Sequence, residues 1–214
     1  HVGLAARRDH LAAKLPHGDK RKLEVAMLMA LEPEVVMFDE PTAGMGVDEV
    51  PVILELIRRL KARGDKTILL VEHKMDVIQT LADRIVVLHN GRLVARRPTW
   101  AYAARTRSRP MSDGSLLRLE GVHTHIGEYH ILQGVDLAVP RGALTVLLGR
   151  NGAGKSTTLR TIMGLWQASR GRTTFAGREI TSASTPEIAR AGIAFVPEDM
   201  GIFSGLTVQE NLRL

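Results

Sequence analysis

The chain has 214 residues, of which 44% are hydrophobic and 24% charged, a composition typical of a globular protein with one or two domains. No run approaches the roughly eighteen apolar residues that a membrane span needs, and the lack of cysteine excludes disulfide scaffolds, cysteine-bound zinc and thiol chemistry. The chain begins at His1 and shows no signal peptide, so we expect it to be part of a longer protein.

Much of the net charge of +6 is concentrated between Arg96 and Arg109, where five arginines occur before the next acidic residue, Asp113. Interleaved prolines and serines favour a solvated basic linker, which we place at residues 96–115. A nucleic-acid-binding surface is the alternative interpretation of such charge. Four Phe, two Tyr and two Trp leave little aromatic material for base stacking, so no nucleic-acid partner is expected.

Residues 1–95 alternate between helical and strand patterns, which favours a mostly parallel α/β sheet. The helix over Asp48–Arg63 is indicated by Pro51 in its first turn, basic residues in its last turn and Gly64 beyond it. The other expected elements, in chain order, are a helix over Asp19–Leu31, a strand over Val35–Phe38, a strand over Thr67–Val71, a helix over Met75–Ala82, and strands over Arg84–Leu88 and Arg92–Ala95.

Residues 116–214 open with a different pattern, because Leu116–Val122 and His130–Val139 indicate antiparallel strands. The later expected elements are a buried strand over Ala143–Leu148, a helix from the following glycine-rich loop to Met163, a strand over Thr173–Phe175, a helix over Pro186–Arg190 and a strand over Ile193–Val196. The imidazoles of His123, His125 and His130 could form a metal site, but exposed strand histidines are the favoured interpretation, because their spacing matches no metal motif.

The loop Gly149–Ser156 has the form G-x-x-x-x-G-K-[ST], and it follows a strand and precedes a helix. Glycines let successive N–H groups turn inward around phosphate oxygens, and the helix N-terminus adds partial positive charge. Lys155 would supply a cation to the terminal phosphates, and the Ser156 hydroxyl can ligate Mg²⁺. The sequence therefore predicts a nucleotide phosphate site.

A second group of polar residues follows the strand Val35–Phe38, where Asp39 and Glu40 would lie at the carboxyl edge of the sheet. One carboxylate can hold Mg²⁺ while the next polarises an attacking water molecule. His73 follows the strand Thr67–Val71 and would lie near the same edge.

Together these features resemble the ATPase subunits of ABC transporters over nearly the whole chain. The residues that carry the resemblance are Leu15–Asp19, Asp39–Thr42, Val71–His73 and Gly149–Thr157. Residues 1–95 and residues 116–214 are both most similar to the paired ATPases of branched-chain amino acid importers, or of related amide and urea importers. The resemblance implies an ABC-type P-loop fold, a mostly parallel sheet with a small antiparallel part, and ATP and Mg²⁺ as cofactors.

The resemblance also implies a role for each matching residue. Glu40 is the general base and His73 senses the γ-phosphate, while Asp39, Ser156 and Glu198 are the metal ligands, Glu198 standing at the Q-loop position. The remaining assignments are the ATP-binding loop, Gly149, Arg150, Asn151, Gly152, Ala153, Gly154, Lys155, Ser156 and Thr157, and the signature that closes on ATP from an opposite subunit, Leu15, Pro16, His17, Gly18 and Asp19.

Several positions depart from the pattern of the family. Pro16 replaces the signature serine and so offers neither a hydroxyl nor a backbone donor, and Glu198 replaces the Q-loop glutamine. Gly46 stands where the family usually has Asp or Asn. Ile126 occupies roughly the position of the aromatic that stacks on adenine, for which Tyr129 is a nearby substitute.

The order of the motifs is the largest departure, because the phosphate loop here follows the signature and both carboxylates. Residues 1–95 resemble the C-terminal half of one ATPase, and residues 116–214 resemble the N-terminal half of the next. In a tandem protein Glu40 and Lys155 would serve different ATP molecules. We expect instead that the halves complement each other as one permuted module, with both carboxylates within roughly 10 Å of the Lys155 ammonium, as in a shared phosphate–metal site.

By resemblance, the chain is expected to bind and hydrolyse ATP as part of an importer of branched-chain amino acids or related solutes. The implied partners are a second ABC ATPase, permease membrane subunits and, indirectly, a periplasmic solute-binding protein, at the cytoplasmic face of the inner membrane. Two alternatives stay open at this point: an ABC ATPase that acts on nucleic acid or as a regulator, and a fragment that binds ATP without hydrolysing it.

Overall fold

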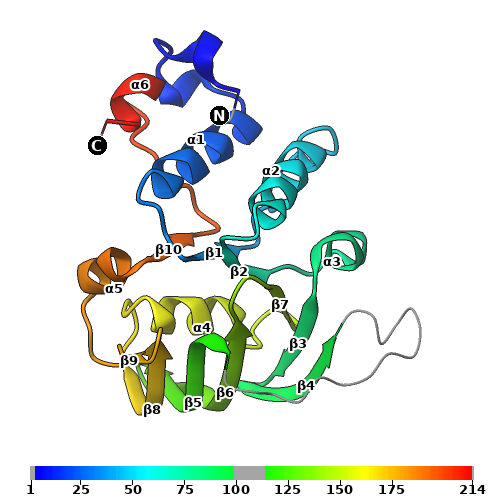
Figure 1. Cartoon of the computed structure of the whole chain (residues 1–214), viewed down its shortest axis with the longest axis vertical. Coiled ribbons are helices and arrows are strands. Elements are labelled where there is room, and N and C mark those ends of the chain that lie inside the picture. The colour runs from blue at the N-terminus through cyan, green and yellow to red at the C-terminus, as the bar shows by residue number, and fades with distance from the viewer. Residues whose placement is uncertain (1–2, 99–113, 214) are drawn as a thin grey trace.

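A six-stranded sheet forms the centre of the chain in the computed structural model, which describes residues 3–98 and 114–213 (Figure 1). Its strands lie in the order β10-β1-β2-β7-β3-β4. Every neighbouring pair is parallel except the hairpin of β3 and β4. The strands are β1 (Val35–Asp39), β2 (Thr67–Val71), β3 (Arg84–His89), β4 (Arg92–Pro98), β7 (Leu144–Leu148) and β10 (Ile193–Val196).

This sheet is built from both predicted segments. β7 comes from the second segment, yet it lies between β2 and β3 of the first, with Leu70 paired to Val146 and Val86 paired to Leu147. β10 of the second segment pairs with β1 at the far edge. The predicted α/β class with a mostly parallel sheet is confirmed. Neither segment alone holds all the strands of this sheet.

A smaller antiparallel sheet packs beside the first, in the order β6-β5-β8-β9. Its strands are β5 (Ser115–Ile126), β6 (Tyr129–Pro140), β8 (Ala168–Phe175) and β9 (Arg178–Glu179). The predicted antiparallel pair of β5 and β6 is present, with His125 opposite His130 near the end of the hairpin.

Helices cover both faces of the parallel sheet. Alternate residues of its strands accordingly belong to different hydrophobic clusters, one on each face. In β1, Val36 and Phe38 pack with Ile53 and Ile57 of α2, whereas Met37 packs on the opposite side. The helices are α1 (His17–Met29), α2 (Val50–Ala62), α3 (Met75–Leu81), α4 (Lys155–Ile162), α5 (Thr185–Ala191) and α6 (Val208–Asn211), with short 3-10 turns at Ala5–Arg7 and Ala12–Lys14.

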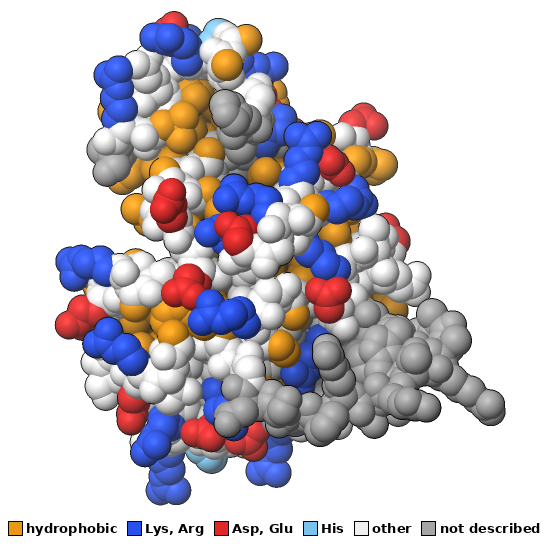
Figure 2. Space-filling model, viewed as in Figure 1, with side chains coloured by type: hydrophobic (Ala, Val, Ile, Leu, Met, Phe, Trp, Pro, Cys, Tyr) orange, Lys and Arg blue, Asp and Glu red, His pale blue; other side chains and the backbone are white. Residues whose placement is uncertain are grey.

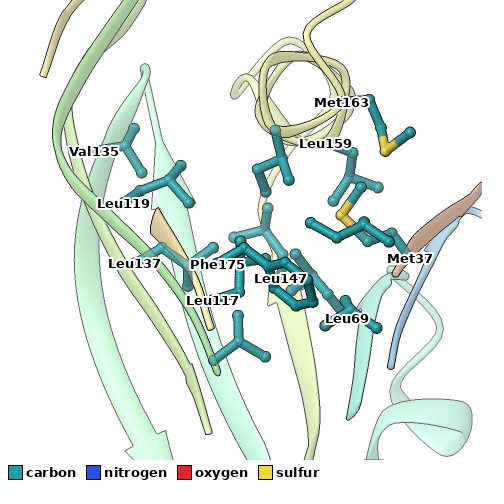
Figure 3. Packing of buried hydrophobic residues seen from close by; sticks show 14 of the residues in the cluster. Met37, Leu69, Leu117, Leu119, Val135, Leu137, Leu147, Leu159, Met163 and Phe175 are labelled. Carbon is teal, nitrogen blue, oxygen red and sulfur yellow. The ribbon is translucent and has the colours of Figure 1, made fainter. Parts of the chain in front are cut away.

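The largest hydrophobic cluster lies between the parallel sheet, α4 and the antiparallel sheet (Figure 3). Met37 and Leu69 of the first segment there meet Leu117, Leu147 and Leu159 of the second. Full burial of one such side chain is worth about 1.5–3 kcal/mol. Separation of the segments would therefore expose one face of a shared core.

The two ends of the described chain form a separate small unit beyond β1 and β10 (Figure 1). Leu4, Leu15 and Leu23 of the N-terminal region pack there with Val208 of α6. Backbone hydrogen bonds join the same parts, among them one from the Val208 N–H to the His10 carbonyl oxygen at 3.0 Å.

Several of the predicted element boundaries change; for example, β5 continues to Ile126 rather than Val122, and β8 begins at Ala168 rather than Thr173. β4 runs to Pro98, so residues 96–98 of the predicted linker lie in a strand, while residues 99–113 lie outside the described part. The short helix α6 was not predicted, although Thr207 and Glu210 form a capping box at its start. Within residues 3–98 and 114–213, no helix is both long and apolar enough to cross a membrane.

Candidate phosphate-binding site

The glycine-rich loop lies between the end of β7 and the start of α4, as its pattern predicts. Gly154 caps α4 with a φ of +101°, a left-handed conformation that favours glycine. A Cβ atom at Gly149 would lie 2.5 Å from the Leu88 carbonyl oxygen of the neighbouring strand β3. Both glycines are therefore required by the backbone path of the loop.

Lys155 is the first residue of α4, and its side chain is only 5% exposed. Its ammonium Nζ donates hydrogen bonds to the carbonyl oxygens of Gly149 at 3.1 Å and Arg150 at 3.4 Å. The same atom lies 3.5 Å from Glu40 Oε1, inside the roughly 10 Å expected of a shared phosphate–metal site. The structure thus places the loop cation of one segment against a carboxylate of the other.

Asp39, at the end of β1, meets the phosphate loop through Ser156, whose hydroxyl donates to Asp39 Oδ1 at 2.9 Å. Asp39 is fully buried, and its other oxygen, Oδ2, has no hydrogen-bond partner among the described residues. Burial raises the pKa of Asp39; the hydrogen bond from Ser156 opposes the rise, and the negative charges of Glu40 and Glu198 add to it.

These groups fit a magnesium ion. A buried carboxylate oxygen without a donor gains from a cation, and Mg²⁺ commonly takes one or two protein oxygen ligands while water and phosphate oxygens supply the rest. Asp39 and Ser156 are the candidate ligands from their contact, and Glu198 lines a pocket together with Ser156.

Glu40 follows β1 with a φ of +44°, an uncommon left-handed conformation for a residue other than glycine. Its carboxylate lies between Lys155 and His73, with Oε2 3.5 Å from His73 Nδ1. Glu72 is fully buried. Its carboxylate accepts hydrogen bonds from the Thr42 hydroxyl and the His73 backbone N–H, and so it links the segment after β1 to the segment after β2. Sequence reasoning included Glu72 in the segment Val71–His73 but gave it no role of its own.

A polar pocket of about 330 Å³ opens in front of these residues. Its lining includes Ile131 of β6, to which sequence reasoning gave no role, and does not include Ile126 or Tyr129. Tyr129 is 76% exposed at the end of the hairpin. The residues that line the pocket are Glu40, Ile131, Asn151, Gly152, Gly154, Lys155, Ser156, Thr157 and Glu198.

The residues predicted as the signature, Leu15–Asp19, do not line this pocket; they lie at the start of α1. Leu15 is buried in the small terminal unit, and Pro16 takes the position before the first helical residue, where a missing N–H is tolerated. The Gly18 N–H donates to Glu49 Oε1 at 2.8 Å, which lowers the pKa of Glu49. Glu49 Oε2 also accepts from the Gly46 N–H at 3.3 Å.

Two polar residues of this predicted signature, Asp19 and His17, have different surroundings. Asp19 forms ion pairs with Arg7 and Lys22, each at 2.7 Å. His17 Nδ1 is buried without a hydrogen-bond partner in the described part of the chain.

The three histidines of the antiparallel sheet lie together on its surface. His123 Nδ1 is 2.9 Å from His130 Nε2, and the rings of His125 and His130 stack with centroids 4.2 Å apart. Across the described ranges, no group of three or more His, Cys, Asp or Glu side chains is arranged to hold a metal ion.

A larger cavity of about 610 Å³ lies between α1, α4, α5 and β10, and it contains none of the predicted site residues. Hydrophobic side chains gather on the face drawn in Figure 2 in the region of α4 and α5 and again over the terminal unit. Phosphate groups require N–H donors and cations, so the smaller polar pocket fits a nucleotide phosphate better than this apolar cavity does.

Comparison with known proteins agrees with this geometry. Residues 132–213 match the family model described as ABC transporter, a stretch that includes the phosphate loop, α4 and Glu198. The chain has the fold of the ABC ATPases. A solved structure of an ATP-binding subunit of an ABC transporter is 34% identical over 46% of this chain and 40% of its own, with a TM-score of 0.42.

Curated relatives of this chain are named as import ATP-binding proteins. A ribose import ATP-binding protein of Rubrobacter xylanophilus is 30% identical over 91% of this chain and 42% of its own length. An arabinose import ATP-binding protein of Chromohalobacter salexigens is 29% identical over 94% of this chain and 43% of its length. The chain thus spans less than half the length of these relatives, and it is similar to the ATP-binding part of import-type ABC transporters.

Proposed function

We propose that this chain binds Mg²⁺–ATP and serves as an ATPase module that drives solute import through an ABC transporter. We further propose that its two segments, 1–95 and 116–214, act as one module in permuted order. The observation that carries both proposals is the contact of Asp39 and Glu40 with the loop residues Ser156 and Lys155.

Each residue has a definite task in this proposal. Lys155 would exchange its contacts with Glu40 and the loop carbonyls for the terminal phosphates, where the cation lowers the energy of the developing charge. Asp39, Ser156 and Glu198 would hold Mg²⁺, which neutralises phosphate charge when bound. Glu40 would accept a proton from the attacking water molecule, and His73 would orient Glu40.

Membrane coupling is proposed to come through other proteins. The partners are a second ABC ATPase that supplies an opposing signature, permease subunits, and indirectly a periplasmic solute-binding protein, at the cytoplasmic face of the inner membrane. Relatives named for ribose and arabinose import support the import role. They give no support to branched-chain amino acids as the solute.

A second arrangement is favoured by a separate observation. The alignment with a ribose import ATP-binding protein of Pseudomonas putida covers 100% of this chain but 44% of the relative. Because an alignment preserves order, that longer protein holds counterparts of both segments in the same order. In a longer protein, Glu40 and Lys155 would then serve two different ATP sites, each completed by residues beyond this chain.

The test of the proposed binding function compares Lys155→Ala with Arg141→Ala. Arg141 forms an exposed ion pair with Glu34 at 2.6 Å, and it does not line the pocket. We expect Lys155→Ala to weaken Mg²⁺–ATP binding at least tenfold, because a charge-assisted contact to phosphate is lost. Arg141→Ala should bind as the parent does. Affinity of Lys155→Ala within about twofold of the parent contradicts the assignment of the loop.

A further inference from the structure

Helix α1 carries a buried ion pair that the proposed chemistry does not use. Arg21 is fully buried, Glu24 is 3% exposed, and Arg21 Nη1 lies 2.7 Å from Glu24 Oε2. Removal of two charges from water is unfavourable unless further hydrogen bonds satisfy them. The other partners of this pair therefore identify what it holds.

Those partners all belong to one turn, residues 197–201, which follows β10. Arg21 Nη1 donates to the Pro197 carbonyl oxygen at 2.6 Å, and Nη2 donates to the Glu198 carbonyl oxygen at 2.7 Å. At the other end of the turn, the Gly201 N–H donates to Glu24 Oε1 at 2.8 Å. One ion pair on α1 thus fixes both ends of a turn that is 176 to 177 positions away in the sequence.

The same turn places the carboxylate of Glu198 at the polar pocket, which is called the phosphate pocket below. Glu198 lines that pocket together with Lys155 and Ser156, and its charge contributes to the raised pKa of Asp39. The backbone of Glu198 is held by Arg21 while its side chain faces the site. Displacement of Arg21 would therefore move the Glu198 carboxylate relative to Asp39.

We propose that Arg21 and Glu24 are positioning residues that hold Glu198 at the metal and phosphate site. They also tie the place of Glu198 to α1, the helix whose first residues belong to Leu15–Asp19. This inference rests on the proposed function, because Glu198 matters to ATP only if the pocket binds Mg²⁺–ATP. Neither Arg21 nor Glu24 lines the phosphate pocket.

The decisive variant is Arg21→Lys, which keeps the charge but lacks the planar fork that reaches two carbonyl oxygens and Glu24 together. We expect its dissociation constant for Mg²⁺–ATP to rise about tenfold, as is typical when a group that orients a metal ligand is lost. ATP affinity measured in EDTA should stay within about twofold of the parent, because Lys155 and the loop are unchanged. Glu198→Ala should show the same pattern.

The double variant separates positioning from general destabilisation. In the Glu198→Ala background, Arg21→Lys should cause no further loss of Mg²⁺–ATP affinity, whereas independent effects would multiply. Ile53→Val, in a fully buried position of α2, is the stability control and should leave the Mg²⁺ dependence unchanged. If Arg21→Lys fails to fold, Glu24→Gln replaces it, since the amide oxygen can still accept from Gly201 while the pair loses its charge.

Hydrogen exchange without nucleotide tests the contact separately from ATP. Exchange at the Gly201 amide should be faster in Arg21→Lys than in the parent and unchanged in Ile53→Val. If the parent binds Mg²⁺–ATP but Arg21→Lys binds it equally well, or loses the same factor in both backgrounds, the positioning role is wrong and the proposed function stands. If the parent binds no Mg²⁺–ATP, the proposed function is wrong and this role falls with it.

Discussion

The hydroxyl of Ser156 donates a hydrogen bond to Asp39 at 2.9 Å, although 117 positions separate the two residues in the chain. Ser156 lies in α4 directly after the loop that leaves β7, and Asp39 ends β1. Only β2 lies between these two strands, so their carboxyl ends open on the same edge of the sheet. The site therefore depends on the insertion of β7 beside β2.

The role of Glu40 predicts a separation of binding from hydrolysis. Glu40→Gln keeps the size of the side chain but removes the carboxylate that would accept the proton of water. Loss of general base catalysis typically lowers the rate by about 10²–10⁴-fold, while Mg²⁺–ATP binding should be retained. Phosphate release and nucleotide affinity, measured on the same preparation, check this expectation.

The control for Glu40→Gln is Glu34→Gln, since Glu34 precedes β1 and pairs with Arg141 at the surface. Glu34→Gln should hydrolyse ATP at the parental rate. If Glu40→Gln also retains that rate, hydrolysis in the preparation does not use Glu40.

The burial of Asp39 predicts how stability depends on pH without metal. Because its pKa is raised in the folded state, the folded chain binds more protons than the unfolded chain between the two pKa values. The contribution of Asp39 to the free energy of unfolding is therefore most favourable below the unfolded pKa. It is lost as the pH rises through the folded pKa. Asp39→Asn should remove that loss and raise the melting temperature at pH 7 by about 2–4 °C, if relief of the buried charge gives about 1 kcal/mol.

Thermal unfolding in EDTA, followed from about pH 4 to pH 8, measures this effect around the ordinary aspartate pKa. The gain from Asp39→Asn should shrink toward acid pH. Asp48→Asn is the matched control, because Asp48 is exposed. A melting temperature for Asp39→Asn at or below that of the parent at pH 7 would show that the buried carboxylate carries no penalty.

The shared sheet predicts that the two segments stay together after the chain is cut. Trypsin should cleave after Arg105 or Arg107, within the predicted linker, while the folded segments resist. The two fragments should elute as one particle on gel filtration and separate only in denaturant, because β7 lies between β2 and β3. Elution as two separate fragments under native conditions would contradict the single sheet.

Sequence patterns were sufficient for much of the fold, because local signals and tertiary packing agree there. The bounds expected for β2 and β10 are those observed, and the loop before α4 needed only its glycines and the flanking strand. α1 begins two residues before the expected Asp19, since Pro16 ends the preceding extended segment and His17 already has helical hydrogen bonding. The two-residue strand β9 is too short for any periodicity to reveal.

The parts of the site that sequence could not predict depend on contacts between distant elements. Ile131 sits in an ordinary strand pattern, and only the approach of β6 to the loop places it in the pocket. Arg21 and Glu24 stand on a helix whose charged residues are expected to face solvent, yet both are buried against the turn after β10. No periodicity distinguishes a buried ion pair from an exposed one at the same spacing.

The Mg²⁺ dependence of ATP binding by Asp39→Asn tests the central claim most directly, because Asp39 belongs to one segment and the phosphate loop to the other. With parent and variant titrated in EDTA and in excess Mg²⁺, we predict equal ATP affinity in EDTA. We also predict that the gain of affinity on adding Mg²⁺ falls at least tenfold in Asp39→Asn. The same gain in both proteins, within about twofold, would contradict a metal and phosphate site shared by the two segments.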